Sequence, residues 1–325
     1  MTRLAALDLG SNSFHLLVAD TVAGGTIKRV VTRKLTLRLA EPVARDGELG
    51  RDGRRRAGDA FAELVALARD AGAHLIAAVG TQALRQAGDS VKLRERLFDR
   101  HGIEVTVISG LQEGYLSLRG MHAALRVPAD AELLGFDLGG GSFEVSYGRA
   151  GPLAAAASLP LGAAAVRDRL RHDPPRFLER VDLHADALAQ LQPVAREVSG
   201  LRGERAAPPR AAATAGTIRD LGRLGLALAL GAAPERVRGV VVTRDQLERA
   251  YTQVCTLPTG ERLSLPGISD SRADLLPAGG TVLLAAMAAF DLEHLELCDW
   301  GLREGLLLDA LSDGEVVHLD DFQPV

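Results

Sequence analysis

Cysteine is almost absent from this 325-residue chain, which has only Cys255 and Cys298. Two cysteines so far apart provide neither a disulfide framework nor the paired spacing of a zinc site. The sequence shows no charged N-terminal leader with an apolar core, and its apolar runs are too short to cross a bilayer. These absences predict a reduced, cytoplasmic setting and no membrane partner.

Lysine and asparagine are also scarce. Only three of the 38 basic residues are lysines, and the single asparagine is Asn12. The net charge of −4 argues against a general nucleic-acid-binding protein. The excess of arginine has two explanations: guanidinium groups are forked donors that suit phosphate, and a GC-rich genome enriches Arg together with Ala. Composition alone favours the second.

Strand and helix patterns occur in the same order in the two halves of the chain. Each half opens with three apolar, strand-like segments and continues with alternating helical and strand-like segments. In the first half, Phe61, Leu64, Val65 and Ala68 have the spacing of one apolar helix face. The sequence therefore predicts an α/β protein built from two βββαβα units.

The joint between the halves is predicted near Pro128, because no low-complexity linker separates them. This gives a first unit over residues 1–127 and a second over residues 128–325. The segment "GLREGLLLDAL" predicts a final helix over about 301–312, which is expected to pack back on the first unit.

The strongest repeat is a loop. The segment "LDLGSNSFHLLVAD" (7–20) returns as "GFDLGGGSFEVSYG" (135–148), each time an apolar strand ending in Asp-Leu-Gly and followed by Ser-Phe. A strand-like run follows each loop, so both are hairpin turns and not the helix-leading loops of Walker-A or dinucleotide sites. Such turns can offer N–H groups and hydroxyls to an anion. Their residues are also ordinary turn formers, but two matching copies favour a phosphate site.

Asp8 and Asp137 open the two loops. A carboxylate beside a phosphate needs a positive charge between them. Mg²⁺ typically uses one or two carboxylates together with phosphate oxygens, so a divalent cation is predicted here.

Several further motifs accompany the loops. In chain order the set is "DLGSNSFHLLVAD", "GTQALRQAGD", "VISGLQEGYLSLRGM", "FDLGGGSFEV", "SLPLGAAAVRD", "ATAGTIRDL", "LPGISDSRADLLPAGG" and "CDWGLREGLLLD". Together they resemble the actin/Hsp70/sugar-kinase superfamily and, within it, the short form of the exopolyphosphatase/guanosine-pentaphosphate phosphatase (Ppx/GppA) family. The resemblance runs from residue 7 to residue 309. It implies two ribonuclease H-like (actin-like ATPase) domains facing a central cleft.

The resemblance also implies an activity, namely hydrolysis of the terminal phosphoanhydride of inorganic polyphosphate. Glu113 is expected to activate the attacking water and Arg85 to clamp the phosphoryl group. Taken alone, each would be an ordinary charged residue near a helix start. The expected phosphate-binding residues are Ser11, Asn12, Ser13, Gly139, Gly140, Gly141, Ser142, Gly216 and Thr217. The expected ligands of Mg²⁺, or of Mn²⁺, are Asp8, Asp137 and Glu144.

Two positions depart from the family pattern. Gln112 stands beside Glu113 where two adjacent acids are common, and Phe143 replaces a frequent Thr. The match also does not include the extra C-terminal helical domain of long members, so short chains are the expected substrates. Guanosine pentaphosphate (pppGpp) is an alternative substrate, and an ATP-dependent kinase or a non-catalytic phosphate sensor are alternative functions. A homodimer is implied by the resemblance only.

The segment "RDGRRRAGD" is not explained by the resemblance. Its arginines, Arg51, Arg54, Arg55 and Arg56, are either a solvated helix start or a track for a polyanion.

Overall fold

The structure is a computed structural model that describes residues 2–22, 26–203 and 209–312. The chain forms two compact units, Met1–Gly120 together with the segment from Leu302, and Met121–Gly301. The division thus falls after Gly120 and not near residue 127. The reason is that the last residues of the helix Gly110–Ala124 belong to the second unit, where the His122 imidazole lies 3.2 Å from the Gly148 carbonyl oxygen.

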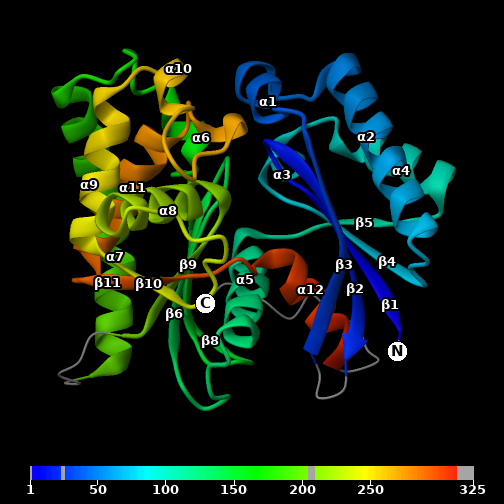
Figure 1. The fold of residues 1–325 in the computed structure, drawn as a ribbon. Coiled ribbons are helices and arrows are strands. Elements are labelled where there is room, and N and C mark those ends of the chain that lie inside the picture. Colours follow the sequence, from blue (N-terminus) through cyan, green and yellow to red (C-terminus); the bar gives the residue numbers. More distant parts are fainter. Residues whose placement is uncertain (1, 23–25, 204–208, 313–325) are drawn as a thin grey trace. The chain divides into compact units, whose positions relative to one another are not determined.

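The first unit is a five-stranded sheet with helices (Figure 1). Its strands are β1 (Arg3–Leu9), β2 (Ser13–Val22), β3 (Thr26–Thr36), β4 (Leu75–Gly80) and β5 (Val105–Val107). Its helices are α1 (Ala40–Asp46), α2 (Gly50–Asp70), α3 (Gln82–Gln86), α4 (Ser90–His101), α5 (Gly110–Ala124) and α12 (Leu302–Ser312). The strand order is β3-β2-β1-β4-β5, in which β1 to β3 are antiparallel and β4 and β5 run parallel to β1.

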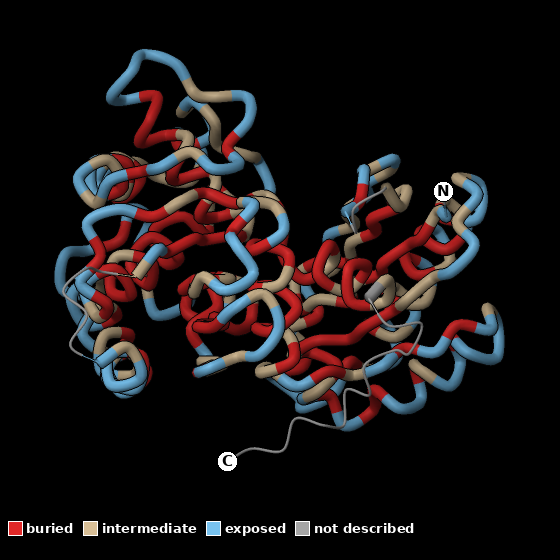
Figure 2. The backbone as a smooth tube through the Cα atoms, turned by 90° about the horizontal axis from the view of Figure 1, so that it is seen from below, coloured by how far each residue is buried: buried red, intermediate tan, exposed pale blue. Residues whose placement is uncertain are grey.

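Successive side chains of a strand point to opposite faces of the sheet, so alternate residues of one strand pack against the same helices. Leu7 and Leu9 of β1 and Phe14 of β2 lie in the core formed with α2 and α4. The apolar face predicted for α2 is confirmed, since Phe61, Leu64, Val65 and Ala68 are all buried. Burial in Figure 2 likewise follows the strands inside each unit.

Helix α12 comes after the second unit in sequence but packs on β1, β2 and β3 of the first. Its Glu304 is only 1% exposed and pairs with Arg29 of β3 at 2.8 Å. Its Asp309 pairs with Arg119 of α5 at 3.1 Å. Gly305 sets how close the two helices come, because a Cβ there would lie 1.8 Å from the Leu116 carbonyl oxygen of α5.

The second unit repeats the first with one added strand. Its strands are β6 (Leu133–Leu138), β7 (Phe143–Gly148), β8 (Leu153–Leu159), β9 (Ala211–Thr214), β10 (Val240–Thr243) and β11 (His294–Leu297). Its helices are α6 (Ala163–Arg167), α7 (Phe177–Arg202), α8 (Gly216–Leu230), α9 (Arg244–Thr256), α10 (Thr259–Arg262), the 3₁₀ turn η1 (Asp270–Arg272) and α11 (Leu276–Ala289).

The strand order of this sheet is β10-β11-β9-β6-β7-β8. Without β10 it reads β8-β7-β6-β9-β11 from the other edge, which is the order of the first sheet. The predicted α/β class and the internal repeat are therefore confirmed within each unit. No helix in the described ranges is long and apolar enough to span a bilayer.

We expect Gly305→Ala to destabilise the first unit by about 1–3 kcal/mol, because the added methyl group overpacks a helix contact that is made by backbone. Urea denaturation gives the free energy of unfolding. Gly58→Ala is the matched control, since Gly58 lies inside α2 with nothing within 4 Å of its would-be Cβ. Gly58→Ala should raise the free energy of unfolding by up to about 1 kcal/mol, because alanine favours a helix more than glycine does. Equal effects of the two changes would contradict the packing argument.

Candidate active site

The first hairpin loop, between β1 and β2, is held through its carbonyl groups. The Ser11 carbonyl accepts from the Ala40 N–H (2.9 Å), and the Asn12 carbonyl accepts from the N–H groups of Leu37 (2.8 Å) and Arg38 (2.9 Å). All three donors belong to the segment that follows β3, the third strand of the repeat.

The second loop, between β6 and β7, is held in the same way by the start of α6, which follows the third strand β8. The Gly139 carbonyl accepts from the Ala163 N–H (3.0 Å), and the Gly140 carbonyl accepts from the N–H groups of Ala164 and Ala165 (both 2.9 Å). Gly162 packs directly on this loop, since a Cβ there would lie 2.2 Å from the Gly141 carbonyl carbon.

The tethered carbonyls fix the direction of the loop N–H groups. In a trans peptide the C=O of one residue and the N–H of the next point in opposite directions. The N–H groups of Asn12 and Ser13 therefore point away from the segment after β3, and those of Gly140 and Gly141 point away from α6. Consecutive N–H groups that converge in this way form an anion-binding concavity.

The serine hydroxyls of the first loop have structural contacts. Ser11 is 6% exposed, and its Oγ accepts from the Ala83 N–H at 3.1 Å, which fastens α3 to the loop. The Ser13 hydroxyl lies 3.5 Å from the Thr36 hydroxyl. The structure thus favours backbone N–H groups over these hydroxyls as the anion donors.

Arg85 and Glu113 lie together in the first unit. The Arg85 Nη1 donates to the Glu113 carboxylate at 3.1 Å and to the Ile108 carbonyl at 2.7 Å. Arg85 is carried by α3, which Ser11 fastens to the first loop, and Glu113 lies in the first turn of α5. Both side chains are mostly buried, at 22% and 12% exposure. The guanidinium therefore holds the carboxylate in a fixed place.

Gln112, the departure beside Glu113, caps α5. Its side-chain oxygen accepts from the Ser109 N–H at 2.6 Å, and its own N–H donates to the Ser109 hydroxyl at 3.2 Å. This is a reciprocal capping box, and Ser-x-x-Gln is visible in the sequence. The amide at this position therefore orders the helix turn that presents Glu113.

The third predicted anion turn, Thr214 to Thr217, joins β9 to α8. Ala215 has φ 103° and ψ 159°, a region that is essentially reserved for glycine. Arg272, which lies in the motif "LPGISDSRADLLPAGG", packs against this turn: a Cβ on Gly216 would be 2.6 Å from its Nη1. Two hydrogen bonds to Asp220, of 2.9 and 3.0 Å, fix the guanidinium. A strained backbone and a fixed guanidinium therefore meet at this turn.

The predicted metal ligands differ between the units. In the second sheet Asp137 lies directly opposite Glu144, which is 2% exposed and accepts from the Ser158 hydroxyl at 2.8 Å. In the first sheet Asp8 lies opposite His15. Two opposed carboxylates disfavour each other in a sheet, so a cation suits the second unit better than the first.

Among the described residues, no group of three or more His, Cys, Asp and Glu is arranged to hold a metal ion. A cation at Asp137 and Glu144 would therefore complete its shell with water and phosphate oxygens. That donor set is the usual one for Mg²⁺.

Comparisons with known proteins agree with this geometry. The model of the Ppx/GppA phosphatase family matches residues 17–313. Exopolyphosphatase 1 of Mycobacterium tuberculosis (strain ATCC 25618 / H37Rv) is 35% identical over 317 residues, which cover 96% of this chain and 90% of that protein. The guanosine-5'-triphosphate,3'-diphosphate pyrophosphatase of Photobacterium profundum is 28% identical over 95% of this chain but only 59% of that protein. The crystal structure of the Aquifex aeolicus family member has a TM-score of 0.81 at 26% identity, covering 97% and 99% of the two chains.

The two repeated sheets, each with a tethered hairpin loop, define a protein of the two-domain actin-like ATPase fold, as predicted. The chain belongs to the Ppx/GppA phosphatase family, and the resemblance inferred from the motifs is confirmed. Members of this family hydrolyse phosphoanhydride bonds, so the protein is an enzyme of that class.

We expect Gly162→Ala to lower kcat/KM by about 100-fold, because a shift of about 1 Å in a binding loop costs that much. Gly162 has φ −59° and ψ 145°, which alanine adopts freely, so any effect comes from the clash with the loop. Gly151→Ala is the control, since nothing lies within 4 Å of its would-be Cβ. Equal kcat/KM values for the two variants would argue against the packing role of Gly162.

Ala215→Gly is expected to raise the free energy of unfolding by about 1 kcal/mol. The strain at Ala215 costs about 1–3 kcal/mol, and the greater freedom of glycine in the unfolded chain offsets about 0.5–1 kcal/mol of the gain. Denaturant midpoints test this. Ala71→Gly, at φ −73° after α2, should instead destabilise the protein. A loss of stability at both positions would disprove the strain at Ala215.

Proposed function

We propose that the protein is an exopolyphosphatase, which hydrolyses the terminal phosphoanhydride of inorganic polyphosphate and releases orthophosphate. The observation that carries the proposal is the Arg85–Glu113 pair, which sets a carboxylate in a fixed place beside the α3 helix that Ser11 fastens to the first loop. A general base must be held within reach of the water that it deprotonates.

The proposed reaction is a single displacement. Glu113 orients a water molecule and accepts its proton while the water oxygen attacks the terminal phosphorus. The bond from that phosphorus to the bridging oxygen breaks, and the chain leaves one phosphate shorter. Arg85 positions the carboxylate and faces the developing negative charge. The N–H groups of both hairpin loops and of the turn at Gly216 and Thr217 bind phosphate oxygens of the substrate.

A divalent cation belongs in the proposal because the substrate is a polyanion. Asp137 and Glu144 are the residues that would hold Mg²⁺ or Mn²⁺. When bound, the ion neutralises charge on the substrate and the leaving group. Asp8 opposes His15 and is the weaker of the three predicted ligands.

Inorganic polyphosphate is preferred over guanosine pentaphosphate as the substrate because of the relatives' lengths. The mycobacterial exopolyphosphatase is matched over 90% of its length, whereas the guanosine-specific relative is matched over 59%. The bond that is cleaved belongs to the same class in both substrates. Hydrolysis of guanosine pentaphosphate therefore remains the second candidate function. Release of orthophosphate from pppGpp would be the evidence for it.

A substrate panel tests the proposal. Purified protein with Mg²⁺ is incubated with tripolyphosphate, long-chain polyphosphate, pppGpp and ATP, and released orthophosphate is measured. We expect release from the inorganic chains at the highest kcat/KM. Orthophosphate released from pppGpp alone would show that the substrate is the nucleotide and not polyphosphate. No release from any of the four compounds would refute the hydrolase assignment.

Glu113→Gln should lower kcat by a factor of about 10²–10⁴, the usual contribution of a general base. Glutamine retains an oxygen that can accept from Arg85, so the thermal midpoint and polyphosphate binding should change little. Glu95→Gln, on the exposed face of α4, removes the same charge elsewhere in the first unit and should leave kcat unchanged. Turnover by Glu113→Gln at the Glu95→Gln rate would exclude Glu113 as the base.

A further inference from the structure

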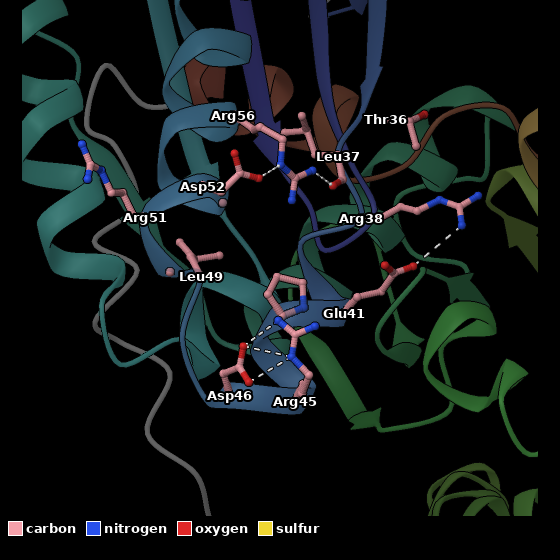
Figure 3. Close-up of a pocket in the computed structure, with 13 residues that line it drawn as sticks. Thr36, Leu37, Arg38, Glu41, Arg45, Asp46, Leu49, Arg51, Asp52 and Arg56 are labelled. Carbon is pink, nitrogen blue, oxygen red and sulfur yellow. Dashed lines mark hydrogen bonds and ion pairs between the residues drawn. The ribbon is translucent and has the colours of Figure 1, made fainter.

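The first unit has a pocket that the proposed reaction does not use. Its volume is about 550 Å³, within the range of small-ligand sites. Its walls come from the end of β3, helix α1, the α1–α2 connection and the first turns of α2 (Figure 3).

Arginine dominates the lining. Four arginines, Arg38, Arg45, Arg51 and Arg56, face three carboxylates, Glu41, Asp46 and Asp52. This leaves an excess of one positive charge. The "RDGRRRAGD" motif contributes Arg51 and Arg56 to the lining, and in Figure 3 the Arg51 side chain points away from Arg45 and Arg56.

The arginines differ in how firmly they are held. Arg56 donates to the Asp52 carboxylate at 2.9 Å and to the Leu37 carbonyl at 2.5 Å, which fixes it over the pocket. Arg45 is 74% exposed, and within the described part of the chain its ion pair is with its sequence neighbour Asp46. Exposed ion pairs of this kind are weak. A phosphate group, which guanidinium binds through two parallel hydrogen bonds, can therefore replace Asp46 at Arg45.

The pocket wall also holds the first hairpin loop. Leu37, whose carbonyl accepts from Arg56, donates its own N–H to the Asn12 carbonyl at 2.8 Å. Arg38, with φ 51°, donates to the same carbonyl at 2.9 Å. Thr36 lies 3.5 Å from the Ser13 hydroxyl. Three successive residues of the pocket thus contact the loop whose N–H groups are proposed to bind the reacting phosphate.

We propose that this pocket binds a linear oligophosphate group, with Arg45 as its exchangeable contact and Arg56 as its fixed one. The inference rests on the proposed function in one respect: the group is the distal part of the chain whose end is hydrolysed. Because Leu37, Arg38 and Thr36 touch both sites, a chain long enough to fill the pocket also steadies the first loop. Chain length is therefore expected to govern affinity.

The test compares Arg45→Gln with Arg96→Gln, which removes an exposed arginine from α4, outside the pocket. KM is measured for tripolyphosphate and for long-chain polyphosphate. We expect the ratio of the long-chain KM to the tripolyphosphate KM to rise at least tenfold in the pocket variant only. The same ratio in both variants would overturn the proposal.

Binding separates this proposal from the hydrolase assignment. Calorimetric titration of Glu113→Gln with long-chain polyphosphate needs no turnover, so it tests the pocket even if the substrate panel fails. Adding Arg45→Gln to Glu113→Gln should raise the Kd for long-chain polyphosphate at least tenfold, and an unchanged Kd for that ligand would refute the pocket. A parallel titration with pppGpp identifies the source: weakening of pppGpp binding together with polyphosphate binding would show that the pocket also takes nucleotide phosphates.

Discussion

Hydrogen bonds to the carbonyl groups of the two hairpin loops are the constraint on which the rest of the site depends. Each loop is short and rich in residues that tolerate many turn conformations. Donors from the segment after the third strand, residues 37–40 in one unit and 163–165 in the other, select one conformation. Because the peptide group is planar and trans, a hydrogen bond that holds the C=O of one residue also fixes the direction of the N–H of the next residue. The direction of the loop N–H groups proposed to bind phosphate is thereby set by the backbone.

The fold was predictable because its elements repeat and carry strong periodicity. The alternating strands of both hairpins and the apolar face of α2 are visible directly in the sequence. Helix α11 is not, because it is apolar on nearly every side and is buried against other helices, so it shows no amphipathic period. Strands β10 and β11 have four residues each and are too short to be distinguished from loops.

The contacts of the predicted site residues could not be derived from the sequence. Sequence placed Arg85 and Glu113 in separate motifs, and only the fold brings them to 3.1 Å. The hydroxyls of Ser11 and Ser13 were natural candidates for phosphate ligands, yet tertiary neighbours hold both. Arg272 had no local signal, because its position against Gly216 depends on a segment more than fifty residues away and on its bonds to Asp220.

Duplication also explains how two similar loops acquire different chemistry. The same register position holds His15 in the first sheet and Glu144 in the second, each opposite the aspartate that opens its loop. An imidazole opposite a carboxylate adds no second negative charge, whereas two opposed carboxylates repel each other. The exchange of a single residue at this position therefore gives the two loops different charge. Because the tether after the third strand is backbone, the side chains on the strands were able to diverge while the anion-binding loops kept their shape.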